Sequence, residues 1–201
     1  PSGFYLAHRV DGKEQPLVST IGDSTFFHMG IPGLVNAVYN RHAFVLAILD
    51  NSITAMTGGQ PNPNVGTKLR KGDVGARVDI EGAVRGCGVG HVEVVEAYDM
   101  ASGEKAVKAA WEYAKEHQAP AVVIFRHPCM LLRCEQEKIL VRVDESRCVG
   151  CKFCINFFNC PALVFDEEKN KAVVDDRFCV QCGTCIPVCP HGAIVRVPEE
   201  A

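Results

Sequence analysis

The sequence predicts an α/β domain with a parallel sheet, followed by a small α+β domain organised around cysteines. Residues 16–126 alternate short apolar runs with helical patterns, and this alternation is typical of a parallel sheet covered by helices on both faces. Eight of the eleven cysteines then fall in two similar runs near the C-terminus. We therefore expect domains at 1–128 and 144–201, with a connector at 129–143 that ends in a short strand, Ile139–Val143.

The first domain contains four apolar runs and three helical patterns. The expected strands are Pro16–Ile21, Ala43–Leu49, Val92–Ala97 and Ala121–Phe125, and the expected helices are Met29–Tyr39, Val78–Arg85 and Ser102–His117. Ser102 is the expected N-cap of the last helix. The stretch from Asn51 to Gly75 is irregular and rich in proline and glycine. Loops of that length are uncommon in compact domains and are often functional.

The two cysteine runs form an internal repeat. The first consists of Cys148, Cys151, Cys154 and Cys160, and the second of Cys179, Cys182, Cys185 and Cys189, each followed by a proline. The repeat predicts two halves related by a pseudo-twofold axis. In each run two residues separate the first three cysteines, which gives the pattern C-x2-C-x2-C. This pattern, followed by a fourth cysteine and a proline, is typical of proteins that hold two iron–sulfur clusters. Zinc and disulfides are the alternatives, but a zinc site would leave the third cysteine of each triplet without a role.

In two-cluster proteins of this pattern, the fourth cysteine of each run ligates the other cluster. We therefore assign Cys148, Cys151, Cys154 and Cys189 to one [4Fe-4S] cluster, and Cys179, Cys182, Cys185 and Cys160 to the other. The first run has five residues before its last cysteine, Ile155–Asn159, where the bacterial pattern has three. This extension is either a harmless insertion or a change in the exposure of the neighbouring cluster.

Polar residues follow the first two predicted strands. Gly22, Asp23 and Ser24 come after the first strand, and Asn51 follows the second. The carboxyl ends of parallel strands are where such sheets bind ligands. The Asp23 carboxylate, the Asn51 amide oxygen and the Ile53 carbonyl would offer Mg²⁺ three oxygen ligands. Ser24 and Thr25 would open a helix whose N–H groups suit a phosphate.

These residues resemble a known motif. Gly22-Asp23 with the later Asn51 resembles the magnesium–thiamine-diphosphate motif, and Thr57-Gly-Gly-Gln60 resembles a stretch of the 2-oxoacid:ferredoxin oxidoreductases. The longer segments 22–28 and 49–58 are similar to the α subunit of the indolepyruvate type, which also ends in a two-cluster ferredoxin domain with a lengthened first run. The resemblance covers nearly the whole chain.

The resemblance implies a thiamine-diphosphate-binding domain followed by a ferredoxin-like domain, with thiamine diphosphate, Mg²⁺ and two [4Fe-4S] clusters as cofactors. The implied reaction is oxidative decarboxylation of a 2-oxo acid, such as the arylpyruvate indolepyruvate, to acyl-CoA and carbon dioxide. The clusters would pass the electrons to an external ferredoxin. Pyruvate, branched-chain 2-oxo acids and 2-oxoglutarate are alternative substrates. A ferredoxin-type electron carrier without catalysis is the alternative function, but a carrier has no need for Asp23 with Asn51.

The resemblance also implies cofactor contacts from a set of loop and helix-start residues: Gly22, Asp23, Ser24, Thr25, Asn51, Ile53, Thr54, Met56 and Thr57. His28 is a candidate catalytic residue facing the thiazolium or the substrate, or else an ordinary histidine at a helix start. The run Lys68–Lys71 either meets the phosphates of coenzyme A or is a solvated surface. The isolated Cys87, Cys129 and Cys134 are expected to be packed thiols.

The net charge and the hydropathy of the sequence limit the partners and the cellular location that we expect. A formal net charge of −3 does not favour nucleic acid, and no apolar run approaches the roughly 18 residues of a membrane span. The thiol pattern without a signal peptide favours a reducing cytoplasm. The chain begins at Pro1 inside a helical pattern, so we expect it to be part of a longer polypeptide. The implied partners are the pyrimidine-binding domain, which would supply the activating glutamate, and a second (β) subunit.

Overall fold

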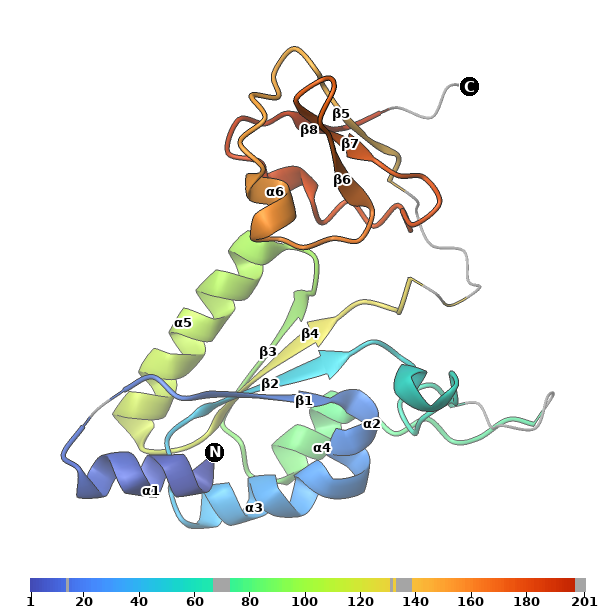
Figure 1. The fold of residues 1–201 in the computed structure, drawn as a ribbon. Helices are drawn as coiled ribbons and strands as arrows, with labels where there is room; N and C mark the ends of the chain where they lie inside the picture. The colour runs from blue at the N-terminus through green and yellow to red at the C-terminus, as the bar shows by residue number, and fades with distance from the viewer. Residues whose placement is uncertain (14, 67–72, 131, 133–138, 198–201) are drawn as a thin grey trace. The chain divides into compact units, whose positions relative to one another are not determined.

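A computed structural model describes residues 1–13, 15–66, 73–130, 132 and 139–197, and it divides the chain into two compact units (Figure 1). The first unit is Pro1–Cys129 and the second is Met130–Ala201. Residues 129–143, predicted as a connector, are therefore grouped mainly with the second unit. The Lys68–Lys71 run and Cys134 lie outside the described residues.

The first unit contains the predicted parallel sheet. Its strands are β1 (Val18–Gly22), β2 (Val45–Asp50), β3 (His91–Glu96) and β4 (Ala121–Arg126), all parallel and in the order β1-β2-β4-β3. The first four residues of β2 and of β4 are buried, as expected for central strands that are covered on both faces. The carboxyl ends of all four strands therefore lie at one edge of the sheet.

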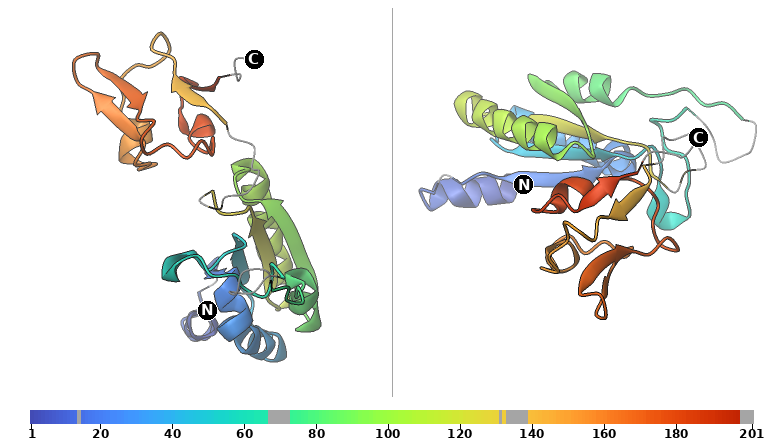
Figure 2. Two further views of the ribbon diagram at one scale, coloured as in Figure 1. Left: turned by 90° about the vertical axis from the view of Figure 1, so that its right-hand side faces the viewer. Right: turned by 90° about the horizontal axis from the view of Figure 1, so that it is seen from above.

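Helices cover both faces of the sheet (Figures 1 and 2). On one face, α3 (Ile31–Tyr39) and α4 (Ile80–Gly86) pack against the sheet residues Phe44, Leu46, Ile48, Val122 and Ile124. On the other face, α1 (Ser2–Val10) and α5 (Met100–His117) pack against Ala43, Val45, Ala121 and Val123. Successive strand residues alternate between the two cores, because side chains along a strand point to opposite faces.

The N-cap of α5 differs from the prediction. The helix begins at Met100, and the cap is Asp99, whose Oδ1 accepts from the Ser102 N–H at 3.1 Å. Ser102, the predicted cap, instead donates its hydroxyl to Asp99 Oδ2 at 2.6 Å. An aspartate at the N-cap position accepts from a free N–H group of the first turn. The helix therefore begins at Met100, before Ser102.

The helix after β1 begins at Asp23 rather than at the predicted Met29. It starts as α2 (Asp23–Thr25), widens into the π-helical turn η1 (Phe26–Gly30), and continues as α3. The Phe26 side chain is fully buried, and a β-carbon on Gly30 would lie 2.9 Å from the Phe26 ring. Gly30 therefore leaves room for the Phe26 ring. A π-turn interrupts the 3.6-residue period on which the prediction relied.

The second unit is built from two short antiparallel pairs. Strand β5 (Val141–Val143) pairs with β8 (Ile194–Arg196), and β6 (Leu163–Asp166) pairs with β7 (Lys171–Val174). The short helices α6 (Phe153–Asn156) and η3 (Ile186–Val188) occupy the cysteine runs. Each half of the repeat begins with a strand that pairs with the last strand of the other half. This pairing fits the predicted pseudo-twofold relation.

His42 makes the stability of the first unit depend on pH. Its ring is 6 % exposed, tilts against Tyr5 at 5.1 Å between ring centroids, and has a buried Nδ1 without a partner among the described atoms. Burial, and then the charge of Arg9, lower the pKa of His42 below its ordinary 6.5. The folded state therefore binds protons less readily than the unfolded state, and stability falls as the pH drops below 6.5.

We expect the melting temperature to fall between about pH 7.5 and about pH 5.5, and to fall less in His42→Phe, because the variant has no imidazole to titrate. Melting curves followed by circular dichroism would measure this difference. His28→Gln, at an exposed histidine, is the control and should keep the wild-type slope. Equal slopes in wild type and His42→Phe would show that His42 is not responsible.

Candidate functional site

The ends of β1 and β2 meet at the carboxyl edge of the sheet. Gly22, the last residue of β1, pairs with Leu49 of β2, so Asp23 and the residues after Asp50 leave the sheet side by side. The Ser52 N–H donates to Asp23 Oδ2 at 3.0 Å, which joins the two segments. Asn51 turns back on its own loop, where its Oδ1 accepts from the Ile53 N–H at 3.2 Å. The structure thus brings Asp23 close to the segment that carries Asn51 and Ile53.

Asp23 is a buried carboxylate surrounded by neutral donors. It is 2 % exposed, and in the described part of the chain it accepts from the N–H groups of Ser24 at 2.7 Å and Ser52 at 3.0 Å, and from the Asn62 amide at 2.9 Å. Burial raises the pKa of Asp23 above its ordinary 3.8, and the charge of Asp50 adds to this, although the Asn62 and Ser24 hydrogen bonds oppose it. The negative charge is therefore costly as it stands, and a bound cation would relieve that cost.

Asp50 is the second buried carboxylate at this edge, and it was not predicted as a site residue. It is 1 % exposed, and its Oδ2 accepts from Arg126 Nε at 2.7 Å. Arg126 also reaches Glu81 of α4 at 3.1 Å. Burial alone would lower the pKa of Arg126, but the hydrogen bonds that it donates to Asp50 and Glu81 raise the pKa above its ordinary value. Asp50 is thus neutralised within the protein, whereas the donors to Asp23 carry no charge.

Two asparagines from the loop complete the edge, and sequence reasoning missed both. Asn62 donates to Asp23, and Asn64 Nδ2 donates to Asp50 Oδ1 at 2.7 Å. Both side chains are buried. The only signal for them in the sequence is the pair of polar residues in Pro61-Asn62-Pro63-Asn64, which is otherwise typical of a turn.

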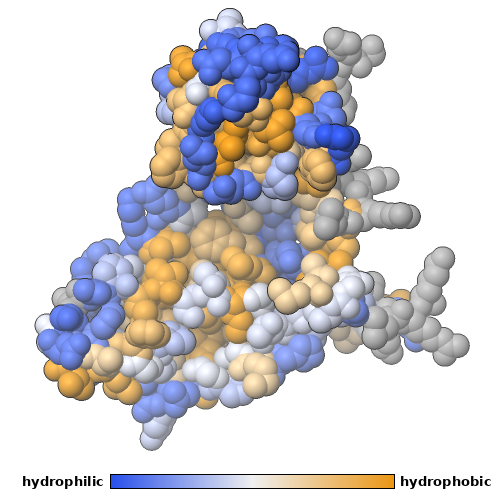
Figure 3. Space-filling model, viewed as in Figure 1, coloured by the Kyte–Doolittle hydropathy of each residue, from blue (hydrophilic) through white to orange (hydrophobic). Residues whose placement is uncertain are grey.

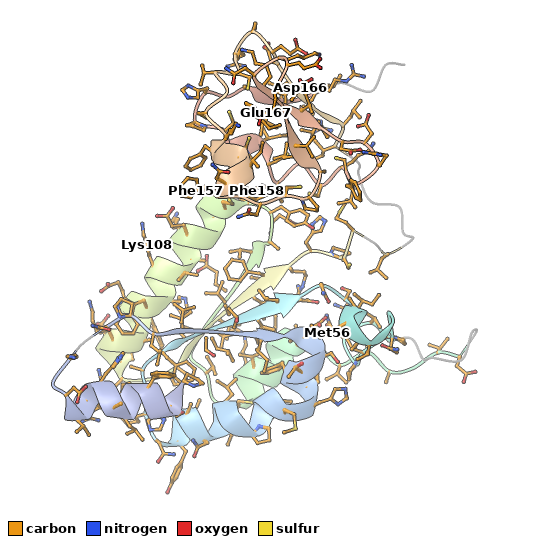
Figure 4. All side chains as sticks on the ribbon, in the orientation of Figure 1. Met56, Lys108, Phe157, Phe158, Asp166 and Glu167 are labelled. Carbon is orange, nitrogen blue, oxygen red and sulfur yellow. The ribbon has the colours of Figure 1, made fainter. Side chains whose placement is uncertain are left out.

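The remaining predicted residues line the loop and the first helical turn. Ser24 uses its N–H to bond Asp23, while Thr25 and His28 are exposed in α2 and η1. Thr54 is half-buried and forms an isolated antiparallel β-bridge with Gln60 across the loop. The Thr57 hydroxyl donates a hydrogen bond to the Gln60 side chain. Met56, labelled in Figure 4, is fully exposed in the 3₁₀ turn η2 (Ala55–Thr57). His28 and Met56 therefore lie at the surface of the described unit.

The oxygen donors at this edge suit Mg²⁺. A carboxylate, an amide oxygen and a backbone carbonyl are hard ligands of the kind Mg²⁺ selects, and Asp23 has a charge that its own neighbours do not neutralise. Among the described residues at this edge of the sheet, no three His, Cys, Asp or Glu side chains are arranged to hold a metal ion. The candidate magnesium ligands contain a single acidic side chain, so they depend on a phosphate and water for the other positions.

The eight cysteines of the second unit fall into two electrostatic groups. Burial raises the pKa of Cys154, and the nearby Cys189, Cys151 and Cys148 raise it further. Burial likewise raises the pKa of Cys185 to about 11, together with Cys160, Cys182 and Cys179. Cys154 and Cys185 are therefore each coupled to the other two cysteines of their own triplet and to the last cysteine of the other run. This grouping supports the crossed ligand sets, which remain a proposal.

The two cysteine loops share one backbone design. The residues before them, Asp144 and Asp175, accept from the N–H of the first cysteine, Cys148 or Cys179, at 3.0 and 3.1 Å. The third and fifth positions of both loops have positive φ: Gly150 and Lys152 in the first, and Gln181 and Gly183 in the second. The repeated geometry explains how two different sequences present their thiols alike.

The extension of the first run, Ile155–Asn159, lies partly in α6. Phe153 and Phe157 stack there with ring centroids 4.8 Å apart, and Phe157 is 73 % exposed. Figure 4 labels Phe157 and Phe158 beside this helix, and Figure 3 shows hydrophobic surface on the same unit. The insertion therefore adds an exposed aromatic surface. Of the isolated thiols, Cys87 packs against the first core, and Cys129 is half-buried.

Two family models match the chain in the regions just described. Residues 2–125 match "Thiamine pyrophosphate enzyme, C-terminal TPP binding domain", and residues 140–190 match "4Fe-4S dicluster domain". The first match covers the sheet. The second match covers both cysteine runs and ends before strand β8. The second match also favours clusters over zinc or disulfides.

Relatives similar along most of the chain carry one name. The chain is 47 % identical over 165 residues to "Indolepyruvate oxidoreductase subunit IorA" of Archaeoglobus fulgidus, covering 80 % of this chain and 25 % of that protein. It is 43 % identical over 198 residues to the subunit of the same name of Pyrococcus horikoshii, covering 95 % of this chain and 30 % of that protein. The resemblance seen in the sequence is thereby confirmed, and the chain spans less than a third of either relative.

The similarity to solved structures is low. A putative thiamin diphosphate-dependent enzyme isolated from Mycobacterium smegmatis is 23 % identical with a TM-score of 0.44, covering 63 % of this chain and 20 % of that one.

In the part of the chain that the structure describes, no helix has both the length and the apolar character needed to cross a membrane.

The crossed ligand sets make a testable prediction. Cys160→Ser combined with Cys182→Ser should damage a single cluster, and the protein should retain about four of about eight irons. Cys160→Ser combined with Cys151→Ser should damage both clusters. Iron analysis and electron paramagnetic resonance after anaerobic reconstitution would distinguish the two double variants. The reverse result would show that each run ligates its own cluster.

Proposed function

The chain belongs to the thiamine pyrophosphate enzymes, whose C-terminal TPP-binding domain it contains, and from this premise we propose that it serves in a 2-oxoacid:ferredoxin oxidoreductase. In this proposal the complete enzyme oxidatively decarboxylates a 2-oxo acid, with an arylpyruvate such as indolepyruvate as the leading candidate. The products are acyl-CoA and carbon dioxide, and two electrons leave through two [4Fe-4S] clusters to ferredoxin. The name of the relatives supports the arylpyruvate.

One observation carries the proposal: a buried carboxylate, Asp23, whose donors among the described residues are all neutral, in the same chain as two groups of coupled cysteines. An electron carrier would need the cysteines alone. A thiamine enzyme that passes electrons to ferredoxin needs both features, because the electrons released at the cofactor must leave singly. The match of residues 2–125 to a TPP-binding domain weighs against the carrier alternative.

Each part of the edge has a role in this proposal. Thiamine diphosphate, when bound, supplies the electron sink for decarboxylation. Asp23, Asn51 and the Ile53 carbonyl would hold Mg²⁺ and through it the diphosphate, and the hydrogen bond from the Ser52 N–H would orient the Asp23 carboxylate. Arg126 neutralises Asp50, which leaves Asp23 as the charged ligand. The cysteine thiolates would hold the clusters, and the burial of Cys148, Cys154 and Cys185 would keep water away from those three sulfurs.

The complete enzyme requires more than this chain. Its length, about a quarter to three tenths of the relatives, supports a pyrimidine-binding domain elsewhere in the same enzyme. A second (β) subunit, coenzyme A and an external ferredoxin complete the proposed set of partners. A reducing cytoplasm fits the exposed Cys151 and the other cluster thiols.

Replacing Asp23 tests the cofactor site directly. In the complete protein, Asp23→Ala should weaken Mg²⁺-dependent thiamine diphosphate binding by more than about 100-fold, because it removes the charged ligand. Asp11→Ala, at an exposed aspartate, is the control. Isothermal titration with thiamine diphosphate, with and without Mg²⁺, measures the effect. A wild-type protein that does not bind the cofactor would refute the proposed function.

Substrate preference separates the members of the family. We expect anaerobic dye reduction by the complete enzyme with coenzyme A to show a higher kcat/KM for indolepyruvate and phenylpyruvate than for pyruvate or 2-oxoglutarate. The Asp23→Ala enzyme provides the background rate. A clear preference for pyruvate or 2-oxoglutarate would leave the oxidoreductase intact and overturn the arylpyruvate assignment.

A further inference from the structure

The segment Asn62-Pro63-Asn64 bridges the two buried carboxylates of the candidate site. Asn62 Nδ2 donates to Asp23 Oδ2 at 2.9 Å, and Asn64 Nδ2 donates to Asp50 Oδ1 at 2.7 Å. The two asparagines are 5 % and 4 % exposed. The buried ends of two neighbouring strands are therefore connected through one short piece of loop.

The hydrogen bonds fix the orientation of the Asn62 amide. Its Oδ1 accepts from the Asn64 backbone N–H at 2.9 Å, so its NH₂ group must face Asp23. A rotated amide would place an oxygen against the carboxylate and lose both bonds. Asn62 therefore always presents a donor to Asp23, and through it the position of Asn64 is tied to that of the carboxylate.

The chemistry of the bridge differs between its two ends. Asp50 has the guanidinium of Arg126 as well as Asn64, whereas Asp23 has Asn62 and two backbone N–H groups. A lysine or arginine in place of Asn62 would neutralise Asp23 and compete with a bound cation. A neutral amide orients the carboxylate and leaves its charge in place. The Asn64 Oδ1 is also buried without a partner among the described atoms, and it remains open to a donor.

The bridge is anchored at several points in the loop. The Asn62 carbonyl accepts from the Val65 N–H at 3.2 Å, and the Pro63 carbonyl accepts from the Val78 N–H at 2.9 Å. Just before it, the Thr54 N–H donates to the Gln60 carbonyl at 2.8 Å. Pro61 and Pro63 restrict φ on either side of Asn62. The bridge is therefore a rigid part of the loop that carries Thr54, Met56 and Thr57.

From these contacts we propose that Asn62 and Asn64 are positioning residues, and we call this pair the clasp. The clasp orients the Asp23 carboxylate toward Mg²⁺ and holds the loop of residues 51–66 at the cofactor. The inference rests on the proposed function and adds two residues to its site. Asn62 acts on Asp23 directly. Asn64 acts by holding Asp50 and by fixing the Asn62 amide.

The test compares Mg²⁺ affinity in the complete protein. With thiamine diphosphate saturating, Asn62→Ala should raise the Mg²⁺ dissociation constant by about 10- to 100-fold, the usual effect of losing a group that orients a metal ligand. Asn62→Ser, which keeps a hydroxyl donor on a shorter side chain, should fall between Asn62→Ala and the wild type. Asn40→Ala, at an exposed asparagine in a side-chain hydrogen bond, is the matched control and should stay within about twofold.

A second readout does not depend on the cofactor. In the metal-free protein, hydrogen exchange at the Ser52 and Val65 amides should be faster in Asn62→Ala than in Asn40→Ala, because both amides bond groups that the clasp fixes. Unchanged Mg²⁺ affinity and unchanged exchange in folded Asn62 variants would overturn the clasp. A wild-type protein that does not bind Mg²⁺ and thiamine diphosphate would instead overturn the proposed function, and the clasp's role with it.

Discussion

The hydrogen bond from the Ser52 N–H to the Asp23 carboxylate holds the candidate site together. It joins the residue that follows β1 to the loop that follows β2, and it is possible only because the two strands are parallel and adjacent. The direction of Asp23, the position of Asn51 and the start of the loop all depend on this contact. The sheet is therefore the scaffold of the site, and the loop is attached to it through a charged group.

The two buried carboxylates at this edge have different electrostatic surroundings because their partners differ. Asp50 is paired with Arg126, which links β2, β4 and α4 through Glu81, so its charge contributes to the structure. Asp23 is hydrogen-bonded but not neutralised, and burial raises its pKa. A buried ion pair keeps its charges compensated within the protein, whereas a buried charge without a counterion among the described residues is typical of a site where a ligand supplies one. The second arrangement costs stability that a cation can restore.

Local sequence patterns were sufficient for the sheet and for part of the site. The apolar runs predicted all four strands, because β2 and β4 are buried on both faces, and the alternation of elements predicted their parallel direction. The order β1-β2-β4-β3 was not predicted, since it depends on how helices cross the sheet. Asp23 and Asn51 could be placed because each follows a strand. Asn62, Asn64 and Arg126 could not, because they reach Asp23 and Asp50 from 39, 14 and 76 positions away.

The exchanged strands of the second unit restrict how that unit can fold. Strand β5 at its start has no partner until β8 at its end is in place, and each proposed cluster needs a cysteine from both halves. Neither half can complete a metal site or a strand pair alone. The second unit therefore cannot close until β8 pairs with β5. With the proposed crossed ligands, assembly of the two clusters would be a single cooperative event, governed by the slow closure of distant contacts.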